Sequence, residues 1–170
     1  APVASIVDGN IKKQAEGDSV RIISGNPLTG KKVAEDGFLT ATAHQVTVIP
    51  EGDKYEMLGW IAPRFNKFSV SRSYFSWLCP KKQYKLDTNI NGGIRPLIMT
   101  GNFEKVFPFD IYPMQLIKAC IIKDIDQMEE LGIYEIDAED FALCEVIDPS
   151  KTPIQQIVRE SLEMLRKEMN

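Results

Sequence analysis

Near its middle the chain reads Leu97-Ile98-Met99-Thr100-Gly101-Asn102-Phe103-Glu104-Lys105-Val106-Phe107-Pro108, and a second stretch of the same spacing runs from Ala138 to Pro149. Bacterial ferredoxin-type clusters are held by C-x₂-C-x₂-C-x₃-C-P, in which the last cysteine precedes a proline. Counting back from the two prolines, the eight ligand positions are Leu97, Thr100, Phe103 and Phe107, then Ala138, Phe141, Cys144 and Asp148. One of the eight is a cysteine, so no cluster can be ligated at these positions, and the spacing by itself does not establish a ferredoxin-type scaffold.

The side chains at these positions indicate what replaces the metal. Leu97, Phe103, Phe107 and Phe141 are large and apolar. Each buried side chain of that size stabilises a fold by roughly 1.5–3 kcal/mol. We therefore expect an apolar core in place of a cluster.

Start and stop signals for helices follow in the second half of the chain. Asp110 to Pro113 opens one helix, and Asp124 is placed to cap a second that ends at Leu131 before Gly132. Asp137 is placed to cap a third. Thr152-Pro153-Ile154-Gln155 predicts a capping box at the start of the last helix.

The first half favours strands, with β-branched residues between turn signals. The expected strands are Val20–Ser24, Phe38–Ile49 and Tyr55–Ile61, with Phe68–Trp77 and Tyr84–Ile90 paired as a hairpin. Asn91-Gly92-Gly93 is a loop and a candidate domain boundary. The order, strands and then helices, predicts an α+β fold with a β-rich domain over residues 1–92, hairpin extension included, and a helical domain over 93–170.

Composition excludes several classes of protein. Hydrophobic residues make up 44% of the 170 residues and charged residues 26%, which excludes collagen and disorder over the whole length. The best apolar run, Ile111 to Ile122, contains Lys118 and is shorter than the ~18–20 residues of a membrane span. Three scattered cysteines and one histidine lack the spacing of a metal site, and we expect a soluble chain with reduced thiols in a cytosolic setting.

Charge divides the chain unevenly. Residues 1–85 carry 12 Lys/Arg and 8 Asp/Glu, whereas residues 86–170 carry 8 and 16. Between Glu56 and Asp87 there is no acid, while six cations interleave with aromatic residues: Arg64, Lys67, Arg72, Lys81, Lys82 and Lys85. One interpretation is a surface for anionic lipid heads, nucleic acid or an acidic partner, and the other is a strand-rich segment with aromatics inward. The pI of about 5.1 argues against nucleic acid.

Two motifs do not support catalysis. Gly25 to Lys31 matches G-x-x-x-x-G-K, but Lys32 stands where a phosphate-binding loop needs Ser or Thr, and Pro27 removes a backbone N–H. A β-turn is the better interpretation, which rejects nucleotide hydrolysis. His44 is the sole histidine and fits a structural position in a strand. We expect no catalytic, cofactor-binding or metal-binding residue in this chain.

A family resemblance covers nearly all of the chain in order. The stretch Gly101–Pro113 resembles the C-terminal region of the A subunit of the Na⁺-translocating NADH:quinone reductase. So do 130–132, 140–144 and 149–151, and upstream 23–25, 28–30, 44–46, 58–60 and 66–70. The family is similar to the flavoprotein subunit of complex I and the C subunit of the Rnf complex. That similarity implies a β-grasp-like domain followed by a small helical domain of ferredoxin type from which the cluster ligands are largely gone. Asp148 stands where family members often keep a cysteine.

The resemblance also implies a setting. Members of this family are peripheral proteins without a transmembrane segment, at the cytoplasmic face of the bacterial inner membrane, docked on the membrane subunits of a respiratory pump. The complex oxidises NADH, reduces quinone and exports Na⁺. It uses NADH, flavins, an iron–sulfur cluster and quinone through other parts, so no cofactor is expected in this chain, although the family is associated with quinone.

Two functional hypotheses follow, and an iron–sulfur electron carrier is a remote third. The first is a non-catalytic docking module that contacts chiefly a membrane subunit, or lipid headgroups, through Arg64, Lys67, Arg72, Lys81, Lys82 and Lys85. The second is a quinone-binding β-grasp module with a direct role in quinone reduction. Its contacts would be Met57, Trp60, Phe65 and Phe68, which core packing explains equally well.

Overall fold

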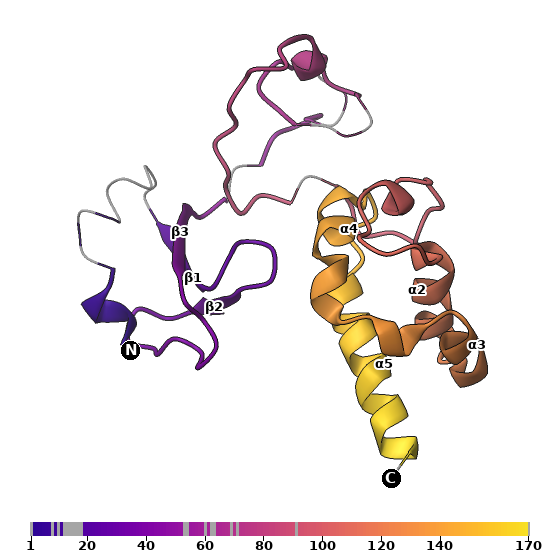
Figure 1. The fold of residues 1–170 in the computed structure, drawn as a ribbon. Helices are drawn as coiled ribbons and strands as arrows, with labels where there is room; N and C mark the ends of the chain where they lie inside the picture. The colour runs from indigo at the N-terminus through magenta and orange to yellow at the C-terminus, as the bar shows by residue number, and fades with distance from the viewer. Residues whose placement is uncertain are drawn as a thin grey trace. The chain divides into compact units, whose positions relative to one another are not determined.

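The computed structural model describes residues 2–7, 9, 11, 19–52, 55–59, 61, 64–68, 70, 72–90 and 92–169 (Figure 1). The described residues form an α+β protein, as expected. Two compact units divide the chain, Ala1–Asn89 and Ile90–Asn170. The domains predicted as 1–92 and 93–170 stay a prediction, since compactness does not establish that either folds alone.

The first unit contains a three-stranded antiparallel sheet of order β2-β1-β3. Its strands are β1 (Val20–Ser24), β2 (Lys31–Val33) and β3 (Val46–Pro50), preceded by a 3₁₀ turn, η1 (Val3–Ser5). Ile22 lies opposite Val33 on one side and Val48 on the other. Because paired residues share a face of a sheet, these side chains form one apolar surface, which packs on Val3, Val7 and Leu39.

The loop between β1 and β2 is a turn, as predicted from Gly25 to Lys31. The Asn26 Oδ1 atom accepts hydrogen bonds from the N–H groups of Leu28 and Thr29, both at 2.8 Å. The chain then enters β2 at Lys31 instead of a helix. The interpretation of this motif as a β-turn is therefore confirmed.

Several predicted strands are wrong. Of Phe38–Ile49 only the end lies in a strand, β3, while Phe38 forms an isolated bridge with Pro2. The predicted strands Tyr55–Ile61, Phe68–Trp77 and Tyr84–Ile90 are absent from the part of this segment that the structure describes, where one 3₁₀ turn, η2 (Phe75–Leu78), is the regular element. Left-handed backbone at Leu58 (φ 53°) and Arg72 (φ 57°) interrupts extended chain there.

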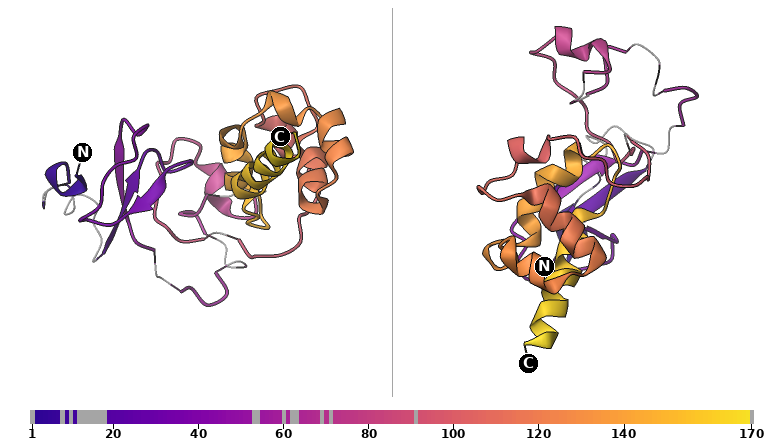
Figure 2. Two further views of the ribbon diagram at one scale, coloured as in Figure 1. Left: turned by 90° about the horizontal axis from the view of Figure 1, so that it is seen from below. Right: turned by 90° about the vertical axis from the view of Figure 1, so that its right-hand side faces the viewer.

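The second unit is helical. Its elements are η3 (Phe103–Lys105), α2 (Pro113–Ile122), α3 (Ile125–Glu130), η4 (Ile133–Glu135), η5 (Ala138–Phe141), α4 (Ala142–Ile147) and α5 (Ile154–Glu168). Figure 1 and the right-hand view of Figure 2 show the last turns of α5 extending beyond the other helices of this unit. The fully buried core includes Phe103, Met114, Leu116, Phe141 and Ile154. Ile121, near the end of α2, is exposed.

Local caps end and begin these helices largely as predicted. Asp124 accepts the Gln127 N–H at 3.1 Å and caps α3, after which Gly132 takes the left-handed conformation (φ 85°). Asp137 and Asp140 form a reciprocal capping box at η5. The predicted signals are confirmed because each depends on residues three to four apart.

The start of α5 is the exception. Pro153 is the N-cap, and the predicted box of Thr152 and Gln155 is wrong. The Gln155 side chain instead donates to Glu145 Oε2 at 2.7 Å. Within the described part of the chain, the buried Thr152 hydroxyl has no hydrogen-bond partner.

Candidate functional site

After β3 the chain leaves the sheet, and it later returns close to the point where it left. The Gly52 N–H donates to the Thr88 hydroxyl at 2.7 Å. A Cβ atom on Gly52 would lie 2.4 Å from the backbone nitrogen of Asn89, so only glycine permits this approach. Residues 55–86, described except for 60, 62, 63, 69 and 71, form a protruding excursion that we call the basic aromatic lobe.

Side chain to backbone hydrogen bonds join the two arms of the lobe. The Ser76 hydroxyl, almost fully buried, donates to the Lys67 carbonyl at 2.5 Å, and the Tyr74 hydroxyl donates to the Gly59 carbonyl at 3.0 Å. The Lys82 ammonium donates to the Phe65 carbonyl at 2.8 Å. These bonds connect the 59–67 arm with residues 74–82, so the part of the lobe that the structure describes has a defined internal structure although it contains no strand.

Two aromatic pairs add to this framework. The ring centroids of Phe65 and Phe75 lie 5.8 Å apart, and those of Phe68 and Tyr84 lie at the same distance in an edge-to-face arrangement. Such pairs contribute roughly 0.5–1.5 kcal/mol beyond their area burial. The first member of each pair belongs to one arm of the lobe and the second to the other.

The single acid of the lobe is neutralised from within. The carboxylate of Glu56 lies 2.9 Å from Arg64 Nη1 and 2.5 Å from Lys67 Nζ. The hydrogen bond from Lys67, with a further contribution from Arg64, holds the pKa of this carboxyl below its usual value. Of the six predicted contact cations, two are thus paired with Glu56. Arg72, Lys81, Lys82 and Lys85 are exposed, and the Lys82 ammonium also donates to the Phe65 carbonyl.

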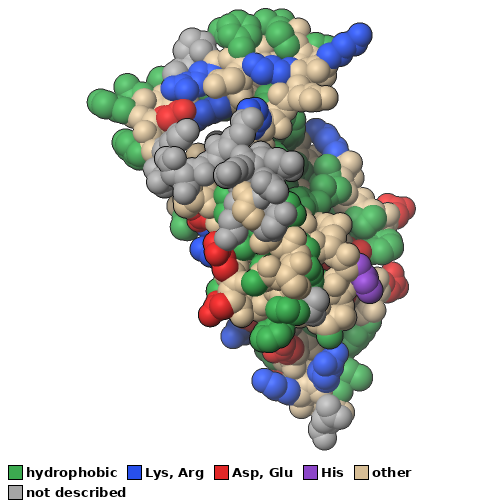
Figure 3. Space-filling view, turned by 90° about the vertical axis from the view of Figure 1, so that its left-hand side faces the viewer, with side chains coloured by type: hydrophobic (Ala, Val, Ile, Leu, Met, Phe, Trp, Pro, Cys, Tyr) green, Lys and Arg blue, Asp and Glu red, His purple; other side chains and the backbone are tan. Residues whose placement is uncertain are grey.

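Large apolar side chains of the lobe are exposed beside these cations. Tyr55 is 92% exposed, Met57 81%, Phe68 61% and Trp77 51%. Others are Leu58, Ile61, Phe65, Phe75, Leu78 and Leu86. Figure 3 shows hydrophobic and basic side chains side by side at the top of that view. A protein surface in water rarely gathers so many, and such patches mark interaction sites.

The predicted quinone contacts do not converge. Met57 is exposed, and Phe65 and Phe68 each belong to a different aromatic pair. Trp60 lies outside the described residues. The residues that are described therefore show apolar surface in this region and not a concave pocket of the kind that a small ligand requires.

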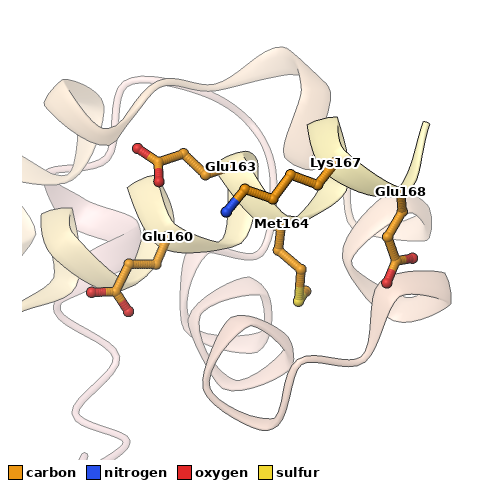
Figure 4. A pocket seen from close by; sticks show the side chains of 5 residues that line it. All are labelled: Glu160, Glu163, Met164, Lys167 and Glu168. Carbon is orange, nitrogen blue, oxygen red and sulfur yellow. The ribbon is translucent and has the colours of Figure 1, made fainter. Parts of the chain in front are cut away.

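A hollow of about 440 Å³ lies on the helical unit (Figure 4). It is lined by Glu160, Glu163, Met164, Lys167 and Glu168. All five side chains come from α5, so the hollow is the open flank of one helix and lacks an opposite wall. We assign no site to it.

Five of the eight predicted cluster-ligand positions meet in the core of the helical unit. Phe103, Phe107, Ala138, Phe141 and Cys144 are all buried in one apolar cluster, and the rings of Phe107 and Phe141 lie 4.6 Å apart. Burial, with a smaller effect of Glu104, raises the pKa of the Cys144 thiol to about 12. Among the described residues no three His, Cys, Asp or Glu side chains gather as a metal ion would require.

Asp148 is a residue whose role sequence reasoning missed. Its carboxylate is fully buried and accepts hydrogen bonds from the N–H groups of Ser150 (3.1 Å) and Thr152 (2.8 Å). The Ser150 hydroxyl in turn donates to the Pro96 carbonyl at 3.0 Å. The available signal was an aspartate two and four residues before the donors, the spacing of an aspartate-stabilised turn.

No described helix has both the length and the apolar character to cross a bilayer. His44, the sole histidine, lies in an exposed loop before β3 rather than within a strand.

Comparison with protein-family models gives no match. Among curated proteins, the chain is 37% identical over 169 residues to the A subunit of the Na(+)-translocating NADH-quinone reductase of Rhodopirellula baltica, an alignment that covers 99% of this chain and 36% of that protein. It is 36% identical to the corresponding protein of Hahella chejuensis over 99% of this chain and 37% of the relative. For a Haemophilus influenzae relative of the same name the identity is 41%, over 87% of this chain and 33% of the relative. The chain thus spans about a third of the length of these relatives, and the resemblance seen in the sequence is confirmed.

Proposed function

Because this chain is homologous over nearly its whole length to one part of the A subunit of the Na(+)-translocating NADH-quinone reductase, we propose that it serves as a docking part of that enzyme without a redox centre of its own. In this proposal the complete assembly transfers electrons from NADH to quinone and exports Na⁺, and this chain lies at the cytoplasmic face of the membrane. Its partners are the other subunits, chiefly a membrane subunit.

The basic aromatic lobe is the surface through which the chain docks. The observation that carries this assignment is the gathering of exposed aromatic and basic side chains on a lobe that hydrogen bonds hold in shape. Water-exposed apolar area is unfavourable by roughly 25 cal/mol per Å², so covering this surface in an assembly is favourable. A preorganised surface loses little conformational entropy on binding.

The helical unit is a ferredoxin-type domain without ligands, and the sheet of the first unit is β-grasp-like. In two-cluster ferredoxins the fourth ligand of each motif serves the cluster of the other motif. Two contacts support the same exchange of fourth positions between the two motifs of this chain. Phe107, at a fourth position, packs on Phe141, and the backbone after Asp148 bonds to residues 93–96, just before Leu97.

The chain binds no cofactor in this proposal, since apolar side chains occupy five of the eight ligand positions and one cysteine remains. EDTA should then leave the melting temperature of the protein unchanged. A fall of several degrees with EDTA would show a metal that contributes to folding, and would overturn the ligand-free domain.

Docking is tested in the complex. Trp77→Ala with Lys81→Glu removes an exposed ring and reverses an exposed charge of the lobe, and co-purification with the other subunits should fall at least roughly tenfold. Lys31→Glu with Lys32→Glu, on β2, is the control, because it reverses two exposed charges outside the lobe. Equal recovery of the lobe variant and the control would refute the assignment.

A quinone-binding role is the alternative, favoured by the exposed apolar side chains of Met57, Phe65 and Phe68. Photolabelling with an azidoquinone should then mark peptides from the lobe. Labelling confined to other parts of the complex would contradict this alternative and leave docking intact.

A further inference from the structure

We propose that the occupant of the basic aromatic lobe is an anionic phospholipid surface, with the cations on the headgroups and the exposed rings at the level of the glycerol backbone. This inference rests on the docking role proposed above and names the chemistry of what covers the lobe.

The charge of the lobe favours lipid over protein. Four of its six cations are lysines, and its single carboxylate is occupied by Arg64 and Lys67. The central parts of protein interfaces are depleted in lysine, whereas basic clusters attract anionic headgroups without any need for matched geometry. A lobe with one internally paired acid also presents little that would repel a negatively charged bilayer.

The placement of Trp77 is the second argument. Two successive turns, closed by the hydrogen bonds Cys79 N–H to Ser76 O and Lys82 N–H to Cys79 O, each at 3.0 Å, bring the chain from Trp77 to Lys81 and Lys82. Trp77 is half exposed, and both lysines are exposed. An exposed amphipathic ring followed closely in the chain by exposed lysines is the combination found where side chains enter the membrane interface.

The other exposed side chains extend this surface. Tyr55 combines a largely exposed ring with a hydroxyl, and Phe68 is exposed although it pairs with Tyr84. Long lysine stems lie along apolar surface while their ammonium groups remain at the headgroups. The lobe therefore offers apolar and cationic contacts together.

The test uses the full chain carrying Trp60→Phe, which leaves Trp77 as the single tryptophan. Vesicles of 30% phosphatidylglycerol in phosphatidylcholine should shift Trp77 emission to the blue, and brominated acyl chains should quench it. Pure phosphatidylcholine should do neither, and 0.5 M KCl should weaken binding. No shift on the anionic vesicles, or the same shift on neutral ones, would overturn the inference.

Charge variants locate the binding. Arg72→Gln with Lys81→Gln should weaken partitioning roughly 30-fold, since each basic side chain near an anionic surface contributes roughly fivefold. The matched control, Lys31→Gln with Lys32→Gln on β2, should have little effect. An equal loss in both variants would show a non-specific charge effect and contradict a lipid site on the lobe. Far-UV circular dichroism checks that each variant is folded.

The two proposals fail in different ways. If lobe variants are lost from the complex while the chain ignores anionic vesicles, docking stands and its partner is a protein surface. If the chain binds anionic vesicles through the lobe but co-purification is unchanged by lobe variants, the docking role falls and the lipid contact remains.

Discussion

The helical unit and the basic aromatic lobe use the same residue types in opposite ways. Phe103 and Phe141 are fully buried, whereas Phe65 and Phe68 are more than half exposed. In the helical unit four helices surround a shared core, so these two rings are covered within the unit. The lobe is a single excursion of the chain, held by hydrogen bonds and two ring pairs, and its apolar side chains need cover from elsewhere.

Truncating one phenylalanine in each region should give the largest difference. Phe141→Ala creates a cavity beside Phe107 and should lower the free energy of unfolding by about 3–5 kcal/mol, while Phe68→Ala should cost about 1 kcal/mol or less. Urea titrations followed by far-UV circular dichroism report the helices. Tryptophan fluorescence reports the lobe, since both tryptophans lie at positions 60 and 77.

Equal losses in the two variants would break the comparison. They would mean either that the lobe is covered within the chain or that the helical core tolerates a cavity. A double variant whose losses add would further show that the two regions are energetically independent.

The reactivity of the cysteine thiols should also differ between the two regions. Cys79, in the lobe, is exposed, whereas Cys120 and Cys144 are buried in the helical unit. Burial raises the pKa of both buried thiols, to about 12 for Cys144. With a disulfide reagent at pH 8 one thiol should react at once, and the other two at least roughly 100-fold more slowly, because they need local unfolding.

Cys79→Ser is the matched control and should abolish the fast phase. Two or three rapid equivalents in the unmodified chain would contradict a closed helical core.

A smaller effect is expected at Asp148, which distinguishes a buried polar anchor from the apolar core around it. Asp148→Ala leaves the N–H groups of Ser150 and Thr152 without their acceptors and should cost about 2–3 kcal/mol of folding free energy. Asp148→Asn keeps one acceptor oxygen and should lose about half as much. Urea midpoints of the two variants measure this, and equal losses would show that charge, not the hydrogen-bond count, matters there.

The two regions also differ in how far they could be predicted from sequence. The caps at Asp124, Gly132 and Asp137 were predictable because a cap depends on residues within one turn. The start of α5 was not, because two carboxylates of the preceding segment accept the N–H groups that the predicted box would have satisfied. Asp148 accepts the Thr152 N–H, and Glu145 accepts the Gln155 N–H.

In the lobe, apolar residues at strand-like spacing carry no information on whether a second layer covers them. The predicted strands Phe68–Trp77 and Tyr84–Ile90 are wrong for that reason, since sheet pairing depends on contacts distant in the sequence. The missing acids drew attention to the six cations, whose contact role stays a prediction. Which of them pair with Glu56 depends on a contact to Arg64 and Lys67 that the sequence pattern did not indicate.

Glu56 gives the smallest expected effect and the one that sharpens the comparison. Its pKa is held below the usual 4.5 chiefly by the hydrogen bond from Lys67. A lowered carboxyl pKa in the folded state stabilises at pH above about 4.5, and this stabilisation is lost as the pH falls through the folded-state pKa. Acidification should thus loosen the lobe before the helices, seen as a change in tryptophan fluorescence without a change in helical circular dichroism.

Glu56→Gln should abolish that fluorescence change, whereas Glu135→Gln, on the helical unit, should preserve it. If both variants retained the change, the pairs around Glu56 would have no part in holding the lobe together, and its ring pairs and backbone hydrogen bonds would be sufficient.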